Sequence, residues 1–102
     1  MTAPLTVDTI RGDAGQIRLI ASGEIDQSNI DVFKKALTAA TEDATGDGKP
    51  VIVDLSAVEY LDSAAVNVLF ASAEVIRLIV HPLLKRILDI SGVSELIPAE
   101  VA

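Results

Sequence analysis

Hydrophobic and polar residues alternate in two short segments near the start of the chain. Apolar side chains recur at about every second position over residues 5–10 and again over residues 16–22. A spacing of two is typical of a strand with one covered face. The segment between them, Arg11–Gly15, contains two glycines and predicts a turn. The pattern therefore predicts an N-terminal β-hairpin.

Three later segments carry hydrophobic residues at helical spacing. We expect the first helix to begin after Ser28 as its N-cap and to end near Glu42. The second begins at Asp62, and the third runs from Pro82 to a left-handed cap at Gly92. The apolar residues that mark the three inner faces are Ile30, Phe33, Leu37 and Ala40, then Val66, Leu69, Phe70 and Ala73, then Leu84, Ile87 and Leu88.

Short apolar runs between these helices predict further strands. Val51–Leu55 is nearly continuous in hydrophobicity, which is typical of a strand covered on both faces. Residues 56–61 then connect it to the second helix. Ile76–Val80 is another strand, and the tail Val93–Val101 adds one edge strand at most, since Pro98 disfavours a central position.

The order of these elements predicts an α/β fold. Because crossover helices join parallel strands, we expect a mixed β-sheet with an N-terminal antiparallel hairpin and with parallel strands packed against helices. The length of 102 residues fits one domain, and we assign residues 1–102 to it.

Composition and charge narrow the function classes. The formal net charge of −7 disfavours nucleic acid and anionic membranes as direct partners, since both require clustered Lys and Arg. The chain has no cysteine, and its first residues lack the pattern of a signal peptide. No apolar run approaches the length of a membrane-spanning helix. We expect a cytoplasmic monomer with a protein or small-molecule partner.

The sequence gives little support to an enzymatic function. Ser63 lacks the Gly-x-Ser-x-Gly elbow of serine hydrolases, and His81 is the single histidine. The glycine-containing segment Gly46–Lys49 precedes a strand and lacks the spacing of a phosphate-binding loop. The carboxylates do not cluster as metal ligands. We therefore expect a non-enzymatic protein that needs no cofactor or metal.

Asp62 and Ser63 stand where a strand leads into a helix. Asp62 is a good N-cap, because its carboxylate accepts backbone N–H bonds and favours the positive end of the helix dipole. Ser63 lies in the first turn, where a phosphate would find free N–H donors. The residues alone favour the capping role and leave a regulated hydroxyl open.

Four motifs, in order, resemble those of the STAS domain, and specifically of stand-alone bacterial anti-sigma factor antagonists. They cover nearly the whole chain: Gly23-Glu24-Ile25-Asp26, then Val53-Asp54-Leu55-Ser56 with Val58, then Tyr60-Leu61-Asp62-Ser63, and finally Pro82, Arg86, Ile87 and Leu88 with Ser91-Gly92-Val93. Each motif is weak separately, and the order and spacing are specific.

The resemblance implies a function. Such an antagonist binds an anti-sigma factor, usually a serine kinase, and thereby frees a sigma factor to join RNA polymerase. The kinase can phosphorylate the antagonist and release it, and a phosphatase restores it. The resemblance implies partner-binding residues around the first turn of the second helix, namely Asp26, Asp62, Ser63, Ala64 and Asn67.

Two residues depart from the family signature. The second hydroxyl residue, often the phosphate acceptor, is Ala64 here, and the usual glycine is Ala65. Ser63 is the hydroxyl that remains and is thus the candidate phosphate acceptor. These departures mean that partner binding is better supported than phosphorylation. They are also compatible with a constitutively active antagonist or with one regulated by other means.

Two other hypotheses remain. The first keeps the fold and makes the chain a STAS subunit of a larger assembly, such as a signalling scaffold or a lipid-transport complex. The second is a small hydrolase that uses Ser63, and the sequence supports it least.

Overall fold

A computed structural model describes residues 4–12, 15–44 and 49–102. Along the chain the elements are β1 (Thr6–Arg11), β2 (Ile17–Ile25), α1 (Ile30–Ala44), β3 (Val51–Leu61), α2 (Ser63–Ala71), β4 (Ile76–Val80), α3 (Pro82–Ser91), α4 (Val93–Leu96) and β5 (Ala99–Val101). Parts of the predicted turns Arg11–Gly15 and Gly46–Lys49 lie outside the described residues.

The strands form one mixed sheet in the order β1-β2-β3-β4-β5. β1 and β2 pair antiparallel, with Val7 opposite Ala21, and the remaining neighbours pair parallel. The α/β fold, the N-terminal hairpin and the parallel strands with crossover helices are therefore as predicted. The predicted edge strand in the tail is β5, which pairs with β4.

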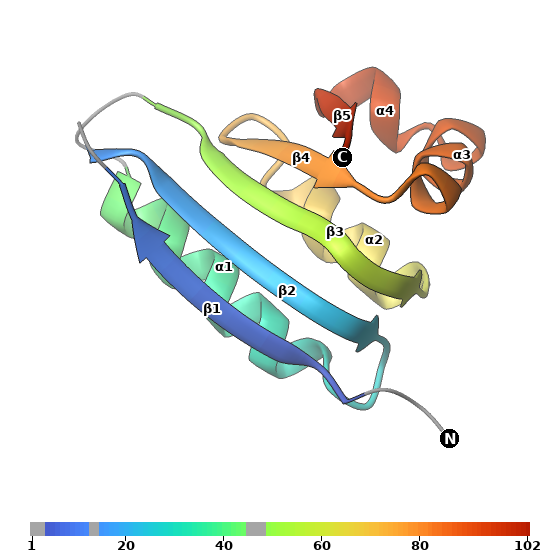
Figure 1. Cartoon of the computed structure of the whole chain (residues 1–102), viewed down its shortest axis with the longest axis horizontal. Helices are drawn as coiled ribbons and strands as arrows, with labels where there is room; N and C mark the ends of the chain where they lie inside the picture. Colours follow the sequence, from blue (N-terminus) through green and yellow to red (C-terminus); the bar gives the residue numbers. More distant parts are fainter. Residues whose placement is uncertain (1–3, 13–14, 45–48) are drawn as a thin grey trace.

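The helices bury one face of the sheet. In Figure 1, α1 and α2 lie on the same side of the sheet, while α3 and α4 lie toward β4 and β5. Leu19, Val53 and Leu78 face the helices and are buried, whereas their neighbours Arg18 and Ile52 face the other side and keep solvent exposure. The prediction that Val51–Leu55 is covered on both faces is wrong, because no described helix lies over the second face.

β3 continues to Leu61, although residues 56–61 were predicted as a connection. Its pairing with β4 stops where Leu55 meets Val80, but its pairing with β2 continues to the end of both strands. Two register shifts relative to β2 accommodate extra residues of β3, as β-bulges do. At the first shift, Asp54 Oδ1 accepts hydrogen bonds from the backbone N–H and the hydroxyl of Ser56, at 3.0 and 2.6 Å.

The helix ends agree only in part with the sequence prediction. Pro82 stands at the start of α3, and Gly92 has the predicted left-handed conformation, with φ of 87°. α1 begins at Ile30, so Ser28 is not adjacent to it as an N-cap. Its hydroxyl donates to Asp26 instead. Ile87 was predicted on the inner face of α3, but it is 48% exposed.

Candidate functional site

Asp62 joins the start of α2 to the loop that leads into α1. Its Oδ1 accepts a hydrogen bond of 3.1 Å from the backbone N–H of Ala65, so the predicted N-cap is confirmed. Its Oδ2 accepts a hydrogen bond of 2.8 Å from the backbone N–H of Gln27. The Asp62 N–H in turn donates to the carbonyl of Ile25 at 3.2 Å. One side chain therefore holds two segments that are far apart in the sequence.

Asp26 organises the same loop from within. Its Oδ1 accepts hydrogen bonds from the backbone N–H and the hydroxyl of Ser28. These hydrogen bonds, the hydroxyl first, hold the pKa of Asp26 below its ordinary value because they stabilise the carboxylate. The loop thus presents a charged carboxylate in a fixed backbone frame.

Asn29 completes this loop and was missed from the sequence. Its Oδ1 accepts from the N–H of Asp26, and its Nδ2 donates to the carbonyl of Glu24, both at 2.9 Å. Its own N–H donates to the carbonyl of Asp26 at 3.1 Å. The sequence did contain a local signal for this role, because the side chains of Asp and Asn often form hydrogen bonds with the backbone of their own turn.

The remaining predicted residues lie on α2. Ser63 and Asn67 are exposed and are separated by one helical turn, so they lie on one face of the helix. Ala64 is half-buried, and Asn67 also borders a shallow groove of about 220 Å³ between α1 and α2. The structure thus places Asp26, Asp62, Ser63, Ala64 and Asn67 around the end of β2 and the start of α2.

Ala65, where the family signature has glycine, is fully buried. Its methyl group belongs to the hydrophobic core, and its N–H is the one that Asp62 caps. Alanine at this position therefore stabilises the helix start through packing and through its higher helix propensity. The first turn of α2 is fixed on its inner side and exposed at Ser63.

His81 acts as a helix cap in the described structure. The single histidine, His81, uses its Nδ1 to accept a hydrogen bond of 3.1 Å from the N–H of Leu83 and thereby caps α3. Within the described ranges, no group of three or more His, Asp or Glu residues is arranged to hold a metal ion. None of the helices described here is both long and apolar enough to span a membrane.

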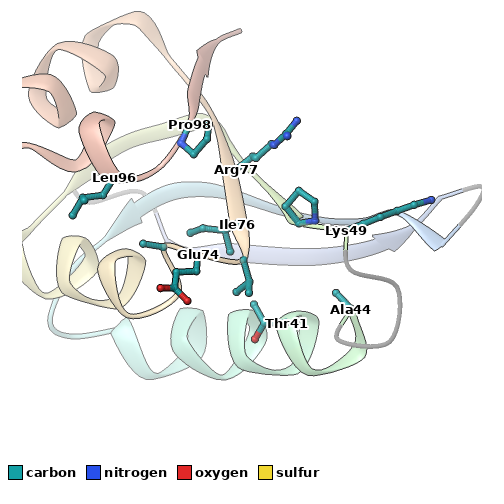
Figure 2. Close-up of a pocket in the computed structure, with 11 residues that line it drawn as sticks. Thr41, Ala44, Lys49, Glu74, Ile76, Arg77, Leu96 and Pro98 are labelled. Carbon is teal, nitrogen blue, oxygen red and sulfur yellow. The ribbon is translucent and has the colours of Figure 1, made fainter.

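A hollow of about 510 Å³ lies at the other end of the sheet. It is bounded by the end of α1, the turn between α2 and β4, and the segment before β5, with Thr41, Ala44, Pro50, Val75 and Leu96 among its lining residues. Figure 2 shows the charged side chains of Lys49 and Arg77 extending toward the right of the view, while that of Glu74 points down on the other side. They do not converge on one point, so this hollow lacks the polar arrangement that orients a ligand.

Comparisons with known proteins agree with this architecture. The model of a family described as "Mlab, STAS domain" matches residues 9–98. A search of curated protein sequences gave no match. The crystal structure of an anti-sigma factor antagonist from Mycobacterium paratuberculosis is similar with a TM-score of 0.81 and 26% identity, over 98% of this chain and 90% of that one.

A second solved structure supports the fold alone. It is an uncharacterized protein of the DUF3478 family with a SpoIIAA-like fold from Shewanella loihica. Its TM-score is 0.62 at 10% identity, over 98% of this chain and 86% of that one. The family match spans most of the sequence and includes the described site around Asp26 and Asp62. The chain therefore belongs to the STAS domain family.

Proposed function

We propose that this protein is a non-enzymatic anti-sigma factor antagonist. It binds an anti-sigma factor, of the serine kinase type, through the surface around the first turn of α2, and a sigma factor is released to join RNA polymerase. Membership of the STAS family and the similarity to the mycobacterial antagonist support this role. A cytoplasmic location follows from the proposal, because RNA polymerase is the final recipient of the sigma factor.

The observation that carries the proposal is the double hydrogen bonding of Asp62. By accepting from both Gln27 and Ala65, the carboxylate fixes the β2–α1 loop against the start of α2. A surface that is rigid before binding loses less conformational entropy when its partner docks. The exposed Ser63 and Asn67 are thus presented in a defined arrangement.

The most direct test is the displacement of a sigma factor. Each anti-sigma factor of the source organism is purified with its bound sigma factor and mixed with this protein. We expect one of them to exchange its sigma factor for this chain. A STAS subunit of another assembly would leave all of them intact and would bind a scaffold or transporter component instead.

Regulation by a phosphate at Ser63 is a separate part of the proposal. Ser63 is exposed at the positive end of α2 and follows Asp62. The Asp62 carboxylate accepts from the N–H of Gln27, which is the residue after Asp26. A phosphate there would gain from the helix N-terminus. It would also add between one and two negative charges at pH 7 beside two carboxylates and would weaken docking of the partner.

Intact mass after incubation with the partner kinase and ATP tests this regulation. We expect one phosphate on the wild-type chain and none on Ser63→Ala. Ser91→Ala, which removes an exposed serine at the end of α3, serves as the control and should still gain the phosphate. Phosphate incorporation that persists in Ser63→Ala would exclude Ser63 as the acceptor.

A further inference from the structure

One face of α3 exposes three large aliphatic side chains. Leu83, Ile87 and Ile90 are 71%, 48% and 81% exposed, and their spacing of four and three residues places them on one side of the helix. Another side of the same helix carries Leu84 and Leu88, which are fully buried in the core. α3 therefore has a second apolar face that does not pack against the core. We call Leu83, Ile87 and Ile90 the stripe, and exposed apolar patches of this kind mark interaction surfaces.

This stripe lies at the same end of the sheet as the candidate site. β4 ends opposite Leu55, so α3 begins beside the part of β3 that continues to Leu61. His81 caps α3 after β4, just as Asp62 caps α2 after the neighbouring strand β3. Figure 1 shows α3 and the start of α2 toward the same end of the molecule.

The site around Asp62 needs such an apolar neighbour. Its residues, Asp26, Asp62, Ser63, Ala64 and Asn67, are all small or polar. A stable protein interface buries about 800 Å² on each partner and draws most of its binding energy from large side chains near its centre. The first turn of α2 supplies specificity and charge, but it offers little apolar area.

We propose that the anti-sigma factor covers the exposed face of α3 together with the start of α2. This inference rests on the proposed function and adds the surface that supplies most of the affinity. Leu83, Ile87 and Ile90 pack against an apolar strip on the partner. Arg86 borders the stripe and forms no ion pair with the described residues, so a partner carboxylate beside that strip would complete the contact.

A second copy of this chain fits the stripe less well. In a twofold pairing of two α3 helices centred on Ile87, the two Arg86 side chains would lie close together near the axis. Two chains that each carry a formal net charge of −7 also repel one another. Both effects favour a partner with a different, complementary surface.

Titration calorimetry measures the affinity of the identified anti-sigma factor for three proteins. They are the wild type, the double variant that combines Ile87→Gln with Ile90→Gln, and the single variant Arg86→Glu. Glutamine keeps helix propensity and the changed side chains are exposed, so the melting temperature should stay near that of wild type. We expect the double variant to bind on the order of tenfold more weakly. Ile10→Gln is the matched control, since Ile10 is 49% exposed on β1 and should bind like wild type.

Two outcomes would overturn the inference while leaving the proposed function intact: unchanged affinity of the α3 variants, or equal weakening by Ile10→Gln. If wild type binds no anti-sigma factor, the proposed function fails, and this assignment of the stripe fails with it. Sedimentation of the free chain is a further check. A dimer that Ile87→Gln with Ile90→Gln dissociates would assign the stripe to a second copy.

Discussion

At the scale of single residues, Asp62 determines the geometry of the candidate site. The sequence predicted its role as an N-cap, because an acidic residue before an apolar helical pattern is a typical helix start. The sequence could not predict its second hydrogen bond, to the N–H of Gln27, because that bond joins segments brought together only by the parallel pairing of β2 with β3. Asn29 differs, because its hydrogen bonds to Asp26 and Glu24 are local and belong to a turn pattern that the sequence contained.

Two substitutions of Asp62 separate its two hydrogen bonds. Asp62→Ala removes the cap and the link to Gln27, and we expect unfolding to require about 1–2 kcal/mol less free energy. Asp62→Asn keeps an acceptor for Ala65 and caps equally well, but its NH₂ group cannot accept from Gln27. The asparagine variant should therefore keep most of the stability and still bind the anti-sigma factor more weakly.

Urea unfolding and calorimetric titration of both Asp62 variants measure these effects. Wild-type stability in Asp62→Ala would mean that the capping hydrogen bond contributes nothing in this structure. Wild-type affinity in Asp62→Asn would mean that fixing the β2–α1 loop is not required for docking.

At the scale of elements, local patterns predicted most of the fold. The helical spacing of Phe33 and Leu37, both buried, and the Pro82 and Gly92 signals at the ends of α3 describe properties of one segment each. The extension of β3 was missed because it depends on pairing with the end of β2. The exposure of Ile87 was missed because helical spacing alone does not say which of two apolar faces meets the core.

The end of α3, where Gly92 is the C-cap, allows a specific prediction about stability. Its φ of 87° is in the left-handed region, and a Cβ added there would meet no atom within 4 Å. Gly92→Ala should therefore destabilise the fold by about 1 kcal/mol through backbone strain alone.

Gly12→Ala is the control for this boundary, because a Cβ there makes ordinary contacts, the nearest at 3.5 Å from the Gln16 carbonyl oxygen, without a positive φ. It should unfold within about 0.5 kcal/mol of wild type in urea. If both glycine variants lowered the free energy of unfolding by the same amount, the left-handed conformation of Gly92 would not be the cause.

At the scale of the whole molecule, the face of the sheet over which no described helix lies carries charges of both signs. The charged residues there include Asp8 on β1, Arg18 and Glu24 on β2, Asp54 on β3, Arg77 on β4 and Glu100 on β5. Arg18 lies 3.6 Å from the Asp54 carboxylate. Charged side chains of both signs solvate this face, whereas the stripe on α3 is apolar and exposed, so we assign the protein partner to the stripe and the start of α2.

Sigma factor release tests the central claim most directly. A complex of an anti-sigma factor with a labelled sigma factor is titrated with this protein, and free sigma factor is followed by fluorescence anisotropy. We predict release that saturates as the added protein reaches the concentration of the complex, and weaker release with Asp62→Ala. Sigma factor that stays bound at a large excess of this protein, for every anti-sigma factor of the organism, would contradict the account.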